Sequence, residues 1–149
     1  GCVNLAPFSY FNIVSNLPPI LMFSCNTPED RDAKDPLTNV RVTGEFVFNL
    51  VSDDLIEVMK ETSTPVARHI DEFEHAGIAR ASSIKVSAPR VANSPCSMEC
   101  KVIRIISFGG GTDAVESQPL CNKALIESTL PALAWQSFDA FLPGLTQIT

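Results

Sequence analysis

The sequence has few basic residues and few of the side chains on which hydrolytic enzymes depend. Its 149 residues include 11 lysines and arginines against 17 aspartates and glutamates, a formal net charge of −6, and only 2 histidines. This acidity argues against nucleic acid or an anionic membrane as the main partner, because both require a basic face. No apolar run approaches the roughly 20 residues of a membrane span, and no targeting segment is evident. We therefore expect a cytoplasmic protein.

Metal and disulfide patterns are also missing. The chain has 5 cysteines and no C-x-x-C pair, namely Cys2, Cys25, Cys96, Cys100 and Cys121. An odd number without zinc-ligand spacing argues against both a disulfide framework and a structural zinc site. Free thiols in a reducing compartment are the simpler interpretation, so we expect no metal.

The common catalytic motifs are absent. The chain contains no G-x-S-x-G, H-E-x-x-H, G-x-x-x-x-G-K-[ST] or strand-linked G-x-G-x-x-G sequence. Residues 109–111 are consecutive glycines, which favour a hairpin turn over a phosphate cradle. The sequence thus identifies no catalytic residue, and in an enzyme of this composition a bound cofactor would supply the difficult chemistry.

What is present indicates a β-rich domain with a hydrophobic core. Hydrophobic residues make up 45% of the chain and charged residues 19%, as in one compact domain. The apolar run 18–24 predicts a strand buried on both sides, and the aromatic and β-branched run 45–51 predicts a second. Residues 95–107 predict a long strand, in which the apolar alternation changes phase after Val102; this change indicates a bulge or a move from one buried face to another.

Short helices are expected around these strands. Residues 35–43 predict a helix with Asp35 as N-cap and Pro36 in its first turn, ended by Gly44. Ser52 is expected to cap a helix over 52–62, and residues 71–77 predict a self-capping surface turn closed by glycine. Segments 122–130 and 131–142 look helical, and an apolar stripe on the second could cover an open sheet edge. We place a β domain at 1–112 and a divergent helical tail at 113–149.

Several linked segments resemble the flavin reductase-like, FMN-binding split-barrel family, in its flavoredoxin-type branch. The resemblance covers residues 1–111 and lies in the order and spacing of its segments. These are Asn4-Leu5-Ala6-Pro7-Phe8-Ser9-Tyr10-Phe11-Asn12, Pro18-Pro19-Ile20-Leu21-Met22-Phe23-Ser24, Lys34-Asp35 with Asn39, Thr43-Gly44-Glu45-Phe46-Val47-Phe48-Asn49-Leu50, Asp71-Glu72-Phe73-Glu74-His75-Ala76-Gly77, and Pro89-Arg90-Val91 with Ser94-Pro95 and Glu99-Cys100. It implies an antiparallel Greek-key split β-barrel, a homodimer, FMN as cofactor and NAD(P)H as a possible co-substrate.

The resemblance also implies where a flavin would bind. It assigns the ring and ribityl contacts to Asn4, Ala6, Pro7, Phe8, Ser9 and Ser24, and the phosphate contacts to Lys34, Asp35 and Asn39. The N-terminal segment is rich in proline and small polar groups, whose backbone can face the polar edge of the ring. Lys34 precedes a predicted helix, where its ammonium adds to the amides and the positive end of the dipole.

Departures from the family pattern leave three interpretations open. Pro36 replaces the hydroxyl residue of the family and removes a hydrogen-bond donor where phosphate is expected. Family members carry a strand before the residue aligned with Gly1, so the chain looks like a fragment or a processed product, and the tail follows no pattern of the family. The protein is therefore an FMN-dependent oxidoreductase accepting electrons from NAD(P)H, a non-catalytic FMN-binding electron-transfer module, or a degenerate member without cofactor.

Overall fold

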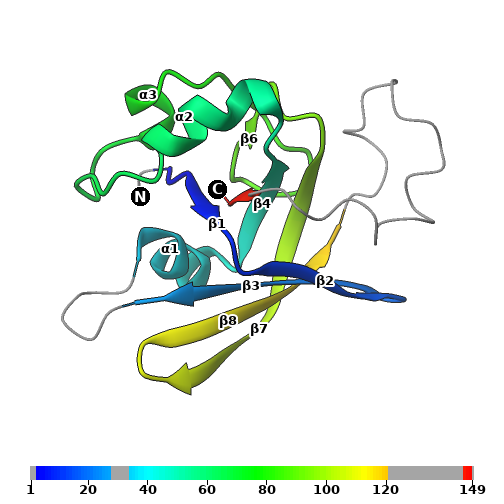
Figure 1. The fold of residues 1–149 in the computed structure, drawn as a ribbon. Helices are drawn as coiled ribbons and strands as arrows, with labels where there is room; N and C mark the ends of the chain where they lie inside the picture. Colours follow the sequence, from blue (N-terminus) through cyan, green and yellow to red (C-terminus); the bar gives the residue numbers. More distant parts are fainter. Residues whose placement is uncertain (1–2, 28–33, 121–145, 149) are drawn as a thin grey trace.

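The computed structural model describes residues 3–27, 34–120 and 146–148, and this part of the chain is mainly β (Figure 1). One antiparallel sheet has the order β1-β9-β4-β7-β8-β3-β2, and β5 pairs with β6 separately. The strands are β1 (Ala6–Phe8), β2 (Phe11–Asn16), β3 (Pro19–Asn26), β4 (Glu45–Leu50), β5 (Arg80–Ala81), β6 (Arg90–Val91), β7 (Ser97–Gly109), β8 (Thr112–Pro119) and β9 (Thr146–Ile148). The helices are α1 (Asp35–Thr43), the 3₁₀ turn η1 (Asp53–Leu55), α2 (Ile56–Glu61) and α3 (Glu72–His75). The mainly β class predicted from the sequence is confirmed.

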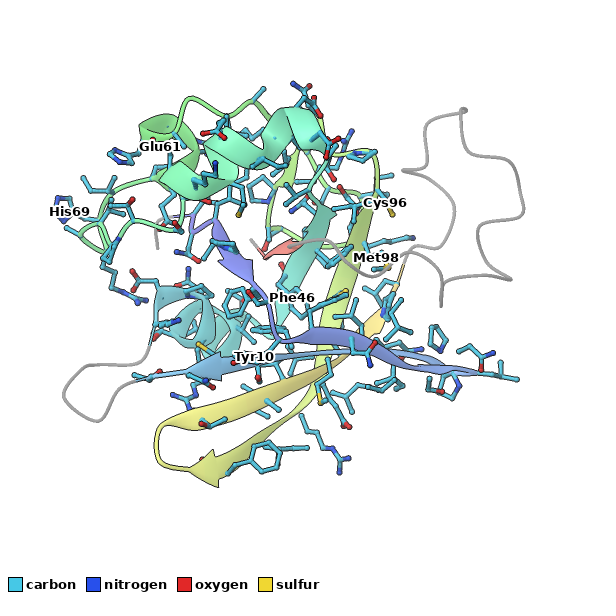
Figure 2. The ribbon with its side chains drawn as sticks, viewed as in Figure 1. Tyr10, Phe46, Glu61, His69, Cys96 and Met98 are labelled. Carbon is cyan, nitrogen blue, oxygen red and sulfur yellow. The ribbon has the colours of Figure 1, made fainter. Side chains whose placement is uncertain are left out.

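Aromatic side chains from three strands form the centre of the core. Phe23 of β3 packs edge-on against Phe8 of β1 and against Phe46 of β4, with ring centroids 4.8 and 5.2 Å apart. Figure 2 shows Phe46 in the interior beside β4. Along β3, Leu21, Phe23 and Cys25 are buried while the residues between them are only partly buried. The prediction that this strand is buried on both sides is therefore wrong, because its second face stays partly open.

The helices begin differently from the prediction. The bounds of α1 match residues 35–43, and Gly44 ends it in the left-handed conformation at φ 69°. The N-cap residue is Lys34 rather than Asp35, and it makes no side-chain cap hydrogen bond. Ser52 is the N-cap residue of η1 but likewise makes no side-chain cap hydrogen bond; its hydroxyl donates to Asp54 Oδ1 at 2.5 Å instead. Asp71 does cap α3, accepting from the N–H groups of Phe73 and Glu74.

Strands β7 and β8 form a long hairpin. The register shifts between Val102 and Arg104, which confirms the predicted bulge, and three glycines with positive φ make the turn. Residues 113–119, which the sequence analysis placed in the tail, belong to β8 and pair with β3 on its other side. The predicted helices at 122–130 and 131–142 lie outside the described residues. Among the described helices, none is long and apolar enough to cross a membrane.

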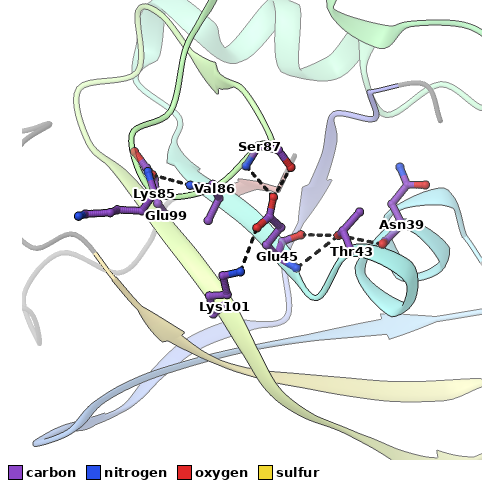
Figure 3. Close-up of polar contacts among 8 residues, drawn as sticks. All are labelled: Asn39, Thr43, Glu45, Lys85, Val86, Ser87, Glu99 and Lys101. Carbon is purple, nitrogen blue, oxygen red and sulfur yellow. Dashed lines mark hydrogen bonds and ion pairs between the residues drawn. The ribbon is translucent and has the colours of Figure 1, made fainter.

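Two glutamates attach the loop before β6 to the sheet (Figure 3). Glu99 of β7 is fully buried and accepts from the N–H groups of Ile84, Lys85 and Val86 at 2.5–3.2 Å. Glu45 of β4 accepts from the N–H of Ser87 at 2.6 Å and lies 3.4 Å from the ammonium of Lys101. These carboxylates pair backbone donors that the short loop cannot pair within itself.

We predict that Gly111→Ala destabilises the protein more than Gly110→Ala. Both glycines have positive φ, 74° and 56°, so either alanine costs about 1 kcal/mol from backbone conformation. A Cβ at residue 111 would lie 1.8 Å from the carbonyl oxygen of Thr27, whereas one at residue 110 meets nothing within 4 Å. Relieving that overlap also breaks the 2.7 Å hydrogen bond from Thr27 N to Gly111 O, adding at least about 1–2 kcal/mol. Urea unfolding measures both variants, and equal losses would contradict the prediction.

Candidate functional site

A small polar cleft is lined by residues from the start of the chain, from α1 and from the loop leading into α3. Figure 1 shows these three segments near one another. The polar lining of the cleft comes from three separate parts of the sequence: Asn4, Asp35 with Asn39, and Arg68 with Glu72. The side chains of Val3, Val66 and Ile70 complete the wall. The cleft encloses only about 10 Å³, which is room for about one water molecule, so a larger ligand would have to widen it.

Arg68 ties the loop before α3 to α1. Its guanidinium donates to Asp35 Oδ1 at 2.5 Å and to Asn39 Oδ1 at 3.1 Å. The Arg68 side chain is 54% exposed and that of Asp35 is 29% exposed, so this pair is a partly solvated one. Its main effect is to orient the groups, since ion pairs of such exposure add little stability. The positive charge of Arg68 offsets the negative charge of Asp35 within the cleft.

Glu72 holds the N-terminal segment from the other side. Its Oε2 accepts from the Nδ2 group of Asn4 at 2.6 Å and from the N–H of Leu5. The residue is only 8% exposed, and burial raises the pKa of its carboxyl to about 7. The hydrogen bond from Leu5 opposes that rise, whereas the nearby carboxylates of Asp35 and Asp71 add to it. Glu72 therefore changes charge near neutral pH.

Asn4 itself carries an unusual feature. Its Oδ1 atom is buried and has no hydrogen-bond partner among the described residues. Buried side-chain acceptors normally have a donor, so an unpaired one needs an explanation.

The structure brings together only some of the residues singled out from the sequence. Asn4, Asp35 and Asn39 share the cleft. Lys34 is exposed at the start of α1, and Ser9 is exposed between β1 and β2. The others lie on β1 and β3 outside the residues that line the cleft: Ala6, Pro7, Phe8 and Ser24.

Two of these residues have their own constraints. The Phe8 side chain is 6% exposed and fills the core against Phe23, so only its backbone can face a ligand. Ser24 is half-buried, and its N–H donates to the carbonyl of Tyr10 at 2.9 Å. That bond places Ser24 beside the segment 6–9 with which the sequence analysis grouped it.

Sequence reasoning missed Arg68 and Glu72. Arg68 lies in a stretch without periodicity, and nothing in its neighbourhood marks it. The turn 71–77 was expected at the surface, yet Glu72 and Phe73 are buried. The available signal was the pair of adjacent acids, because one of them caps α3 and the other is left to find a partner elsewhere.

The curled antiparallel sheet with short helices at its margin is the fold of the split-barrel flavoproteins. Component B of nitrilotriacetate monooxygenase from Bacillus cereus superposes with a TM-score of 0.77 at 29% identity, covering 81% of this chain and 62% of that one. The 2-nitrobenzoate 2-nitroreductase of Pseudomonas fluorescens gives 0.71 at 28% identity, covering 79% and 55%. Flavoredoxin of Desulfovibrio vulgaris, at 19% identity and a TM-score of 0.68 over 79% of this chain and 60% of that one, shares the fold.

Residues 1–117 match the flavin reductase like domain, and the chain belongs to that family. An uncharacterized protein of Aquifex aeolicus is 41% identical over 106 residues, 71% of this chain and 54% of the relative. The uncharacterized protein YwrF of Bacillus subtilis is 36% identical over 108 residues, 72% and 52%. The chain thus spans about half the length of these curated relatives.

We predict that replacing Glu72 changes how stability depends on pH. In the folded state the pKa of Glu72 is about 7, compared with an ordinary value of 4.5. Its stabilising contribution is therefore complete below pH 4.5 and is lost as the pH rises through 7. Relative to Glu72→Gln, the wild type should lose about 2 kcal/mol of unfolding free energy between pH 5 and 8.

Urea unfolding at four pH values between 5 and 8 measures this difference. Glu74→Gln is the matched control, because Glu74 lies on the same helix with its side chain 80% exposed. A pH-independent difference between the wild type and Glu72→Gln would contradict the assignment.

Proposed function

We propose that this protein binds FMN and acts as a flavin reductase-like oxidoreductase that takes electrons from NAD(P)H, and that it does so as a homodimer. The observation that carries the proposal is the meeting of three residues from the resemblance, Asn4, Asp35 and Asn39, on one cleft at the start of α1. Family membership supports the same conclusion. The bound flavin would supply the redox chemistry by accepting a hydride from the reduced nicotinamide.

The residues at the start of α1 fit a phosphate. The N-cap residue of this nine-residue helix, Lys34, makes no side-chain cap hydrogen bond within the described part of the chain. The ammonium of Lys34 is exposed at the same end. Helix dipole, amides and ammonium together favour a phosphate in an otherwise acidic protein. Pro36 contributes no donor, which leaves Lys34 a larger share of the affinity.

In this proposal Asn4 and the segment after it bind the ring and the ribityl chain of the flavin. The buried Oδ1 of Asn4 has no donor among the residues that the structure describes, and a flavin offers a ring N–H and ribityl hydroxyls. Segment 6–9 offers the backbone groups of Ala6, Pro7, Phe8 and Ser9, beside Ser24 of β3. These residues would bind and orient the cofactor, while no described side chain needs to act as a nucleophile.

We predict that Lys34→Glu weakens FMN binding about 10- to 100-fold, the range expected for one charge-assisted contact of about 1.5–3 kcal/mol. Riboflavin, which lacks the phosphate, should bind both proteins equally. Lys85→Glu makes the same charge change at another exposed lysine and should bind FMN like the wild type. Quenching of flavin fluorescence gives the dissociation constants. An unchanged FMN affinity in Lys34→Glu would reject the phosphate assignment.

We also predict that the FMN-loaded protein oxidises NADH or NADPH, measured as loss of absorbance of the reduced nicotinamide. Lys34→Glu should lose this activity at FMN concentrations that saturate the wild type and regain it at higher FMN. Retained FMN without nicotinamide oxidation would favour the electron-transfer module. Failure to retain any flavin would favour the degenerate member.

A further inference from the structure

The contact between Glu72 and Asn4 determines which end of the Asn4 amide is available to a ligand. An ionised carboxylate only accepts hydrogen bonds, so Asn4 turns its Nδ2 donor toward Glu72 Oε2 at 2.6 Å. The Leu5 N–H donates to the same oxygen, so the carboxylate holds the backbone beside Asn4 as well. The Oδ1 atom, on the other branch of the planar amide, is thereby directed away from the Glu72 carboxylate.

That acceptor is enclosed. Asn4 is 9% exposed, and its Oδ1 is buried without a donor in the described part of the chain. Asn4 nevertheless lines the cleft together with Asp35 and Asn39. Because Oδ1 is buried, a ligand donor reaches it only when the residues around the cleft move apart, and it would then pair an acceptor that has no donor among the described residues.

We propose that Glu72 is a positioning residue, whose ionised carboxylate holds Asn4 with Oδ1 presented to an N–H or O–H donor of the bound flavin. This inference rests on the proposed function, because it takes flavin as the donor. A protonated Glu72 is itself a donor. When the Asn4 amide rotates by half a turn, the O–H of Glu72 donates to Asn4 Oδ1, which is then no longer available to the ligand.

The charges around Glu72 help to determine the pH at which it changes from the protonated to the ionised form. Asp35 approaches from α1, where it is paired with Arg68, and Asp71 precedes Glu72 on its own turn, where it is paired with Arg80 at 2.9 Å. Burial is the largest cause of the raised pKa of Glu72, which reaches about 7, and both aspartates add to it. The competent ionised form therefore changes from a minor to a major population between pH 6 and 8.

Riboflavin is the probe that tests this coupling. It lacks the phosphate, whose own titration near pH 6 would alter the affinity for FMN. If only ionised Glu72 is competent, the affinity of the wild type for riboflavin rises about tenfold from pH 6 to pH 8. Glu72→Gln keeps an acceptor at every pH and should bind riboflavin with a pH-independent affinity. Glu74→Gln, an exposed acid on the same helix, should keep the wild-type slope.

Each outcome decides the inference. A pH-independent affinity in the wild type, or an unchanged slope in Glu72→Gln, would overturn the role of Glu72 while leaving flavin binding intact. If the wild type binds neither riboflavin nor FMN at any pH, the proposed function fails, and the inference fails with it.

A second measurement needs no variant and covers the case in which Glu72→Gln does not fold. The carboxyl carbon of Glu72 is titrated by NMR in the wild type, with and without saturating riboflavin. Because coupling is reciprocal, bound riboflavin should lower the pKa of Glu72. An unshifted titration would show that riboflavin does not distinguish the two forms of Glu72, contrary to the proposal.

Discussion

The packing of Phe23 between Phe8 and Phe46 is the interaction on which the shape of the molecule depends. Phe8 lies on β1, one end strand of the sheet, whereas Phe23 lies on β3, next to the other end strand β2. Contact between them requires the sheet to curl until its ends approach each other. The bond from Ser24 N to Tyr10 O fastens the same junction. The start of the chain is thus fixed beside β3, and the cleft forms next to that fixed point.

Two buried glutamates show how one residue type anchors a loop in one place and lines a polar cleft in another. Glu99 accepts from three successive backbone N–H groups, so its carboxylate is saturated and the loop it holds has no unmet donor among them. Glu72 accepts from one backbone and one side-chain donor, with two other carboxylates nearby. A saturated carboxylate anchors a loop. An incompletely satisfied one near acids remains able to exchange a proton at neutral pH.

Local patterns predicted the elements better than the contacts between them. The bounds of α1, the strand at residues 45–50 and the bulge after Val102 all follow from periodicity, glycine and proline. Lys34 rather than Asp35 is the N-cap residue, and the Asp35 carboxylate is bonded to Arg68, 33 positions away. Asn4 and Glu72 are 68 positions apart, and no local pattern of either residue indicates that they meet. The resemblance assigned Asn4, Asp35 and Asn39 to flavin contacts, and the structure places all three on one cleft, but sequence reasoning assigned no role to Arg68 or Glu72, which contact them.

Arg68 and Glu72 matter because the cleft lies beside a second, smaller core. Leu5 is fully buried in a cluster with Leu55, Phe73 and Val91. Its backbone N–H is bonded to Glu72, and Phe73 is the next residue of the same short helix. Leu5 is therefore attached to this region both by its side chain and by its backbone. Since Asn4 is its direct neighbour, the position of α3 determines the position of the Asn4 amide. Movement of α3 would therefore displace Asn4 Oδ1, whereas protonation of Glu72 would reorient it.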